Sequence, residues 1–169
     1  MTTSTSGILA GCCNDRVWVR IEGKGSHQNS RELKAFLLSQ IESTRGQRVV
    51  VDLSFCTGMD STFMGMLACL NGKLEDAGSG LNIINAGGRN GELLRGLGLD
   101  EIFPVEDSCG GFTGTNPECA PIAATGCSRQ ERTEICLESH EALVAADERN
   151  APKFRDVIDL MRNKCALAH

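Results

Sequence analysis

The chain has 169 residues, of which 41% are hydrophobic and 23% charged, and its net charge is −5. This mixture is typical of a globular domain and excludes wholesale disorder. No apolar run approaches the roughly 18 residues that a membrane-spanning helix needs. The acidic balance also lacks the basic footprint of a nucleic-acid-binding surface. We therefore expect one cytoplasmic domain with an appendage, without direct contact to membrane or nucleic acid.

The first expected element is a β-hairpin. Residues 8–13 and 17–22 are two strand-like runs, and in the second run apolar and polar side chains alternate with a period of two. Asn14 and Asp15, between the runs, are residue types that form tight hairpin turns.

Helices and buried strands alternate after the hairpin. The strand at residues 49–53 is apolar on both faces, as central parallel strands are. The expected elements are a helix at 31–44, a strand at 49–53, a loop at 54–60, a helix at 61–76, a strand at 81–85, a helix at 90–97 and a strand at 102–105. This order predicts an α/β fold with helices packed on the sheet.

The composition changes after residue 105. Residues 106–128 are rich in Gly, Thr and Ser, which is typical of a linker. A helical pattern returns at 129–146, and a second helix begins near Pro152. A helical hairpin of this size is too small to fold alone, so it docks on the sheet domain or on a partner. We expect three parts: a sheet domain at 7–105, a linker at 106–128 and a helical hairpin at 129–167.

The most informative stretch is residues 49–65, in which a buried strand ends at Asp52 and Asp60-Ser61-Thr62 opens a helix. Free N–H groups and the helix dipole stabilise a phosphate at such a position. Phosphorylation adds about −1.5 to −2 charges, which beside Asp60 would repel an acidic or apolar partner surface. The simpler interpretation is that Asp60 or Ser61 only caps the helix.

This pattern resembles the STAS domain of bacterial anti-sigma factor antagonists. The resemblance extends over residues 7–105 and includes the leading hairpin, the Val49–Leu53 strand and the Asp60-Ser61 helix start. It implies a STAS fold, with a mixed, mostly parallel sheet, to which this chain adds the C-terminal helical hairpin. It also implies that a serine kinase, itself an anti-sigma factor, phosphorylates Ser61. Thr62, the next residue, is our second choice of acceptor. Asp52 and Asp60 match the two characteristic acids of the family.

One departure from the family concerns the surface beside the switch. The family usually has Ser-Gly or Ala-Gly after the phosphoserine, whereas this chain has Thr62-Phe63. We expect Phe63 to be exposed and to form a partner-binding apolar surface with Met59 and Met64. Asp60 either contacts the partner or supports the helix cap, and Asp52 either contacts the partner or caps loop amides.

The remaining candidates carry weaker signals. Cys136 and His140 lie at i, i+4, but two ligands do not make a zinc site, so we interpret them as packing residues. His27 is interpreted as a structural or incidental loop residue, and residues 87–91 as a strand-to-helix turn rather than a phosphate loop. The nine cysteines are expected to be free thiols. The sequence predicts no metal and no cofactor.

Three functions compete. The preferred one is a phosphorylation-controlled binding module that binds an anti-sigma factor of the serine kinase type while Ser61 is unmodified, with a serine phosphatase resetting it. The alternative is a non-catalytic STAS scaffold in a larger signalling complex. An enzyme is disfavoured because the sequence presents no evident nucleophile–base pair, metal cluster or cofactor loop.

Overall fold

A mixed β-sheet forms the centre of the computed structural model, which describes residues 7–13, 15–43, 46–109, 118–123 and 126–168. The strand order is β5-β3-β2-β1-β6, and β4 pairs separately with β2. β1 (Gly7–Cys13) and β2 (Arg16–Gly25) form the expected antiparallel hairpin, and Asp15 adopts a φ of 59° in its turn. β3 (Arg48–Asp52) runs parallel to β2, and β5 (Leu81–Ile84) runs parallel to β3. The predicted α/β class with a mixed, mostly parallel sheet is confirmed.

A strand occupies most of the segment that was expected to be a loop at 54–60. β4 (Cys56–Met59) pairs in parallel with the end of β2, where Gly23 to Gly25 extend the strand beyond its expected limit. β3 and β4 therefore follow one another along the same edge of β2. The strand has four residues, includes Gly58, and has Thr57 as its single β-branched residue, so its composition does not mark it as a strand.

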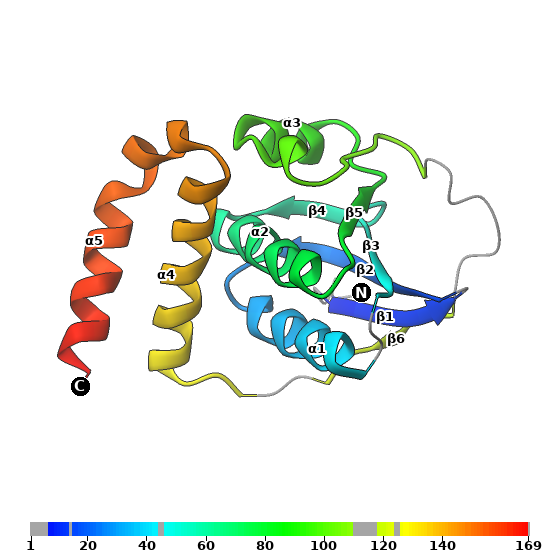
Figure 1. The fold of residues 1–169 in the computed structure, drawn as a ribbon, viewed down its shortest axis with the longest axis horizontal. Helices are drawn as coiled ribbons and strands as arrows, with labels where there is room; N and C mark the ends of the chain where they lie inside the picture. The colour runs from blue at the N-terminus through cyan, green and yellow to red at the C-terminus, as the bar shows by residue number, and fades with distance from the viewer. Residues whose placement is uncertain (1–6, 14, 44–45, 110–117, 124–125, 169) are drawn as a thin grey trace, which may run out of the picture.

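The helices build layers outward from one face of the sheet (Figure 1). α1 (Ser30–Ser43) and α2 (Ser61–Asp76) lie on the sheet. α4 (Arg129–Ala146) packs on α2, and α5 (Ala151–Leu167) forms the outermost layer. The core continues from the sheet through α2 to Leu143 of α4. None of the described helices is both long enough and apolar enough to cross a membrane.

The chain between the sheet domain and the hairpin departs from expectation in two places. After α3 (Arg89–Gly96), a 3-10 turn at Leu99–Glu101 precedes the segment expected to be a strand at 102–105. In that segment only Val105 forms a bridge, with Ile83, so the predicted strand is wrong. Within the expected linker, β6 (Ala120–Pro121) pairs with β1. Residues 110–117 and 124–125 of that linker lie outside the described residues.

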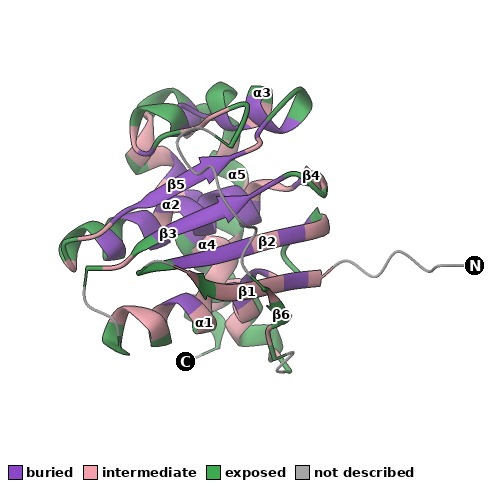
Figure 2. Cartoon of the chain, turned by 90° about the vertical axis from the view of Figure 1, so that its right-hand side faces the viewer, coloured by how far each residue is buried: buried purple, intermediate pink, exposed green. Residues whose placement is uncertain are grey.

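The other face of the sheet is turned toward the viewer in Figure 2. A second, smaller apolar cluster of Trp18, Val50 and Ile84 lies there, with Cys119 packed against it. Over the described part of the chain, the long helices all lie on the opposite side. This asymmetry places α2 and everything built on it on a single face of the molecule.

Candidate functional site

Asp60 caps α2 and ties the helix to a neighbouring loop. Its Oδ1 accepts a hydrogen bond from the backbone N–H of Phe63 at 2.9 Å, which is N-cap geometry. Its Oδ2 accepts from the backbone N–H of His27 at 2.9 Å and lies 3.2 Å from His27 Nδ1. The helix-cap interpretation of Asp60 is therefore confirmed. His27, interpreted from the sequence as structural or incidental, is the residue that holds the second carboxylate oxygen.

The Ser61 hydroxyl meets a histidine from the C-terminal hairpin. Ser61 Oγ lies 2.9 Å from His140 Nε2, although 79 positions separate the two residues. His140 Nδ1 lies 2.7 Å from the backbone carbonyl oxygen of Cys136, and Phe154 of α5 packs edge-on against the imidazole ring. The sequence presents no evident nucleophile–base pair, whereas the structure places a serine hydroxyl and an imidazole nitrogen from distant parts of the chain within hydrogen-bond distance.

Cys136 completes the contact between α4 and the start of α2. Thr62 Oγ1 donates to Cys136 Sγ at 3.8 Å, and Cys136 Sγ lies 3.5 Å from His140 Nδ1. The hydrogen bond from His140 holds the pKa of the Cys136 thiol below its ordinary value, against the effect of burial. Burial is the largest single influence on His140 and opposes its charge, but the contacts with Cys136 together raise the pKa of His140. Cys136 and His140 are packing residues, as expected, but the packing brings them to Ser61 and Thr62.

Gly65 allows the backbones of α2 and α4 to approach closely. A Cβ atom at Gly65 would lie 2.6 Å from the carbonyl carbon of Ser139 and 2.9 Å from its Cβ, and closer still to its carbonyl oxygen. Side chains from 62 to 68 are consequently all buried, on the sheet side and on the α4 side alike. The hairpin therefore covers the outer face of α2.

Polar contacts hold the hairpin at both ends of α4. Arg31 and Lys34 of α1 form ion pairs with Glu131, near the start of α4, and with Glu138, near its middle. Beyond its end, the buried Asn150 side chain donates to the carbonyl oxygens of Leu97 at 2.9 Å and Leu143 at 2.8 Å. The Leu143 carbonyl oxygen also accepts from the backbone N–H of Asp147, whereas the buried Leu97 carbonyl oxygen depends on Asn150 and would be costly to leave unpaired.

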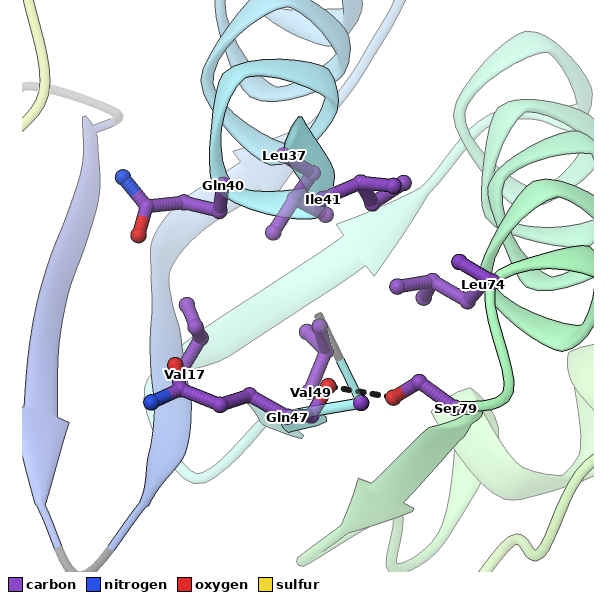
Figure 3. A pocket seen from close by; sticks show the side chains of 10 residues that line it. Val17, Leu37, Gln40, Ile41, Gln47, Val49, Leu74 and Ser79 are labelled. Atoms are coloured by element: carbon purple, nitrogen blue, oxygen red, sulfur yellow. Dashed lines mark hydrogen bonds between the residues drawn. The ribbon is translucent and has the colours of Figure 1, made fainter. Parts of the chain in front are cut away.

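An open hollow of about 580 Å³ lies beside Ser61. Its lining residues come from the His27 loop, α2, α4 and α5: His27, Ser61, Thr62, Arg129, Arg132, Thr133, Cys136, His140, Val157 and Met161. Two arginines and two histidines are among them, and no carboxylate residue is. A second hollow, at the other end of α2, is lined by residues such as Leu37, Val49 and Leu74 (Figure 3). With about 10 Å³ it holds no more than one water.

The apolar residues expected at the partner surface are not exposed. Met59 is 7% exposed, Phe63 0% and Met64 4%, so the expected exposure is wrong. The ring of Phe63 lies against Gly25 of β2, where a side chain would leave no room for it. Phe63 therefore faces the sheet rather than solvent, and α4 covers the side of α2 that faces away from the sheet.

Asp52 belongs to a separate group of contacts. Its Oδ1 accepts from the backbone N–H of Ser54 and from Asn85 Nδ2, each at 2.9 Å, and its Oδ2 lies 3.7 Å from Arg20 Nε. This geometry matches the loop-capping interpretation of Asp52. The structure thus brings Asp60, Ser61 and Thr62 together with His27, Cys136 and His140, and it leaves Asp52 at the end of β3. Among the described residues, no group of three His, Cys, Asp or Glu side chains is arranged to hold a metal ion.

The comparisons with known proteins gave a match to one family model and likenesses to solved structures. A family model described as "Mlab, STAS domain" matches residues 14–105. The solved structure of the anti-sigma factor antagonist SpoIIAA in its unphosphorylated form is 16% identical, covers 63% of this chain and 87% of its own, and gives a TM-score of 0.49. A protein of the DUF3478 family with a SpoIIAA-like fold, from Shewanella loihica PV-4, is 18% identical over the same shares, with a TM-score of 0.45.

Proposed function

This chain belongs to the STAS domain family, and we propose that it is a phosphorylation-controlled protein-binding module. In this proposal it is an anti-sigma factor antagonist: it binds an anti-sigma factor of the serine kinase type while Ser61 is unmodified. The kinase phosphorylates Ser61 and thereby ends the binding, and a serine phosphatase restores it.

The observation that carries the proposal is the position of the Ser61 hydroxyl. Ser61 is the first residue of α2, is partly exposed, and lines an open hollow, so a modifying enzyme can approach it. A phosphate there adds about −1.5 to −2 charges beside the Asp60 carboxylate. It also replaces the hydroxyl that contacts His140 at 2.9 Å. Both changes alter the charge and shape of this surface without requiring the core to unfold.

The covering hairpin limits which residues a partner can touch. Asp60, Ser61 and the His27 loop are accessible at the rim of the hollow. Met59 and Met64 are buried and Phe63 faces the sheet, so a partner cannot touch these three side chains without a rearrangement of the residues packed on them. We place the partner at the rim, with Asp60 as a direct contact and Asp52 as support for the loop after β3. Thr62, 7% exposed and in contact with Cys136, is the second-choice acceptor and requires that contact to open.

A binding measurement tests the proposal. The affinity for the purified kinase-type anti-sigma factor from the same cells is measured by calorimetry for the unmodified chain and for Ser61→Ala, Ser61→Asp and Ser43→Asp. We expect Ser61→Ala to retain binding, and Ser61→Asp to lose at least about tenfold, roughly 1.4 kcal/mol. Ser43, at the exposed end of α1, provides the control for an added negative charge. Equal affinities of Ser61→Ala and Ser61→Asp would contradict the switch.

One observation favours the alternative of a non-catalytic scaffold. The outer helix α5 has a single buried residue, Ile158, and exposes Leu160 at 51% and Leu167 at 87%. Apolar side chains on an outermost helix are suited to assembly with another protein. A molecular mass that rises with concentration, and that Leu160→Lys abolishes while partner affinity stays independent of Ser61, would favour the scaffold.

A further inference from the structure

The contacts of His140 define which of its nitrogens carries a proton. Nδ1 lies 2.7 Å from the carbonyl oxygen of Cys136, which can only accept a hydrogen bond, so Nδ1 is protonated. In a neutral imidazole, Nε2 is then the unprotonated nitrogen, and its lone pair lies 2.9 Å from Ser61 Oγ. The Ser61 hydroxyl therefore donates to His140. Nucleophile, base and a third group that orients the base are all present.

Rigid elements hold this arrangement. His140 and Cys136 are four residues apart on α4, so one helix supplies both the imidazole and the carbonyl that orients it. The edge of the ring packs against Phe154 of α5, with the ring centroids 5.1 Å apart. His140 is 4% exposed. Its two hydrogen-bond partners lie one turn earlier on α4, at Cys136, and at the start of α2, at Ser61. Because both elements are helices packed on each other, the imidazole Nε2 stays directed toward Ser61.

The hollow in front of Ser61 has the chemistry of an anion site. Arg129 and Arg132 lie seven and four residues before Cys136, which places them on the same side of α4. His27 faces the hollow from the loop that binds Asp60, and α5 contributes only Val157 and Met161 to the lining. The guanidinium groups of Arg129 and Arg132 give this part of the surface a local positive charge that attracts small anions, against the net charge of −5 and the Asp60 carboxylate that contacts His27.

We propose that Ser61 is an activated nucleophile with His140 as its general base, and that the hollow takes a small anionic phosphodonor of the acyl phosphate class. This inference rests on the proposed role of Ser61 as phosphoacceptor and adds a second, kinase-independent route to the same modification. The hairpin thereby supplies a functional group to the STAS domain, in addition to covering α2.

The phosphoryl group passes from the donor to Ser61 with one bond formed and one bond broken. Ser61 Oγ attacks the phosphorus of the acyl phosphate, an Oγ–P bond forms and the P–O bond to the acyl group breaks. The leaving carboxylate departs with the bonding electron pair. The hydroxyl proton passes to Nε2 of His140, which then returns it to solvent. Arg129 and Arg132 bind the donor's phosphoryl oxygens electrostatically, and no redox change takes place.

Acetyl phosphate is the probe that tests this chemistry. The purified full-length chain is incubated with it without any kinase, and the gain of one phosphoryl mass is followed over time and mapped by peptide mass spectrometry. We expect modification at Ser61, and a loss of maximal rate of about 100-fold in His140→Gln, in line with removal of a general base. Arg132→Gln is expected to raise the half-saturating donor concentration with little change in maximal rate. Arg162→Gln, an exposed arginine of α5, is the matched control for lost charge.

The pH profile of the unaltered chain provides a readout that does not depend on any variant folding. His140 must be neutral to take the proton, so the rate rises as pH increases through the pKa of His140, which lies above its ordinary value. The charged and titratable groups that face it are Asp60 from the start of α2, Cys136 on its own helix, and Arg129, Arg132 and His27 around the hollow. A rate that is flat or falls over this range overturns the inference, as does equal modification of His140→Gln.

Different results would overturn the acyl phosphate inference and the proposed binding function. If acetyl phosphate leaves Ser61 unmodified while the kinase phosphorylates it, the present inference is overturned and the proposed function stands. If acetyl phosphate modifies Ser61 through His140 but phosphorylation leaves partner affinity unchanged, the inference stands and the proposed function is overturned. Modification that maps to any residue other than Ser61 also overturns the inference.

Discussion

Replacing Gly65 by alanine tests whether α4 is built onto α2. The added Cβ would lie 2.6 Å from the carbonyl carbon of Ser139, whereas carbon atoms in contact are about 3.5–4.0 Å apart, so the two helices must separate by about 1 Å. The atoms it meets include backbone atoms, which cannot turn away as a flexible side chain can. Overpacking of this kind costs about 1–3 kcal/mol, and the better helix propensity of alanine offsets about 0.5–1 kcal/mol of it.

The same helix provides a matched control. Gly72 is exposed, and a Cβ there would meet no atom within 4 Å. We expect Gly72→Ala to stabilise the protein by about 0.5–1 kcal/mol and Gly65→Ala to destabilise it by up to about 2.5 kcal/mol. The assay is urea unfolding followed by circular dichroism, with the midpoint compared at constant m-value. If Gly65→Ala is as stable as Gly72→Ala, α4 does not pack here, and the covered site described above is refuted.

Three further predictions concern the packing of the C-terminal hairpin and the reactivity of the Cys136 thiol. Leu143→Ala removes a fully buried α4 side chain from the main core, and we expect the free energy of unfolding in urea to fall by about 2–5 kcal/mol. A fall below about 1 kcal/mol would indicate that the hairpin is not part of that core. Asn150→Ala removes the donor to the buried carbonyl oxygen of Leu97 and one of the two donors to the carbonyl oxygen of Leu143, for an expected loss of about 1–3 kcal/mol in the same assay, and an unchanged midpoint would argue against both hydrogen bonds. Iodoacetamide at pH 7 should alkylate Cys136 faster than Cys127, because the hydrogen bond from His140 lowers the pKa of Cys136 while burial raises that of Cys127. His140→Gln should remove the difference, and peptide mass spectrometry measures both rates.

Local sequence signals predicted the elements around the site well. The helix expected at 61–76 is α2 at Ser61–Asp76, because an Asp N-cap and an apolar helical pattern mark it without help from the rest of the chain. The helix expected at 129–146 is α4, which begins with a capping box between Ser128 and Glu131. In both helices the signal that defines the start lies within three residues of it.

Elements that depend on distant partners were missed. β4 has no strand composition of its own and forms because β2 offers Gly23 to Gly25 as a pairing edge. The strand expected near Val105 is reduced to one bridge: Pro104 has no N–H to donate, and its carbonyl oxygen accepts from the N–H of Ile83.

In the site, too, some contacts follow from neighbouring residues in the sequence and others depend on residues far along the chain. The cap formed by Asp60 follows from its neighbours, whereas the contact between Ser61 and His140 joins residues 79 positions apart. The i, i+4 spacing of Cys136 and His140 places them on one face of a helix, but only the close approach at Gly65 determines what that face meets. The burial of Phe63 likewise follows from a glycine on β2, which no pattern around Phe63 indicates.

The most direct test of the central claim is phosphopeptide mass spectrometry of the protein isolated from its own cells, with and without phosphatase treatment. If Ser61 is the switch, it carries a phosphate that the phosphatase removes, and the phosphorylated fraction changes between growth conditions. A protein that carries no phosphate on Ser61 under any growth condition would contradict it.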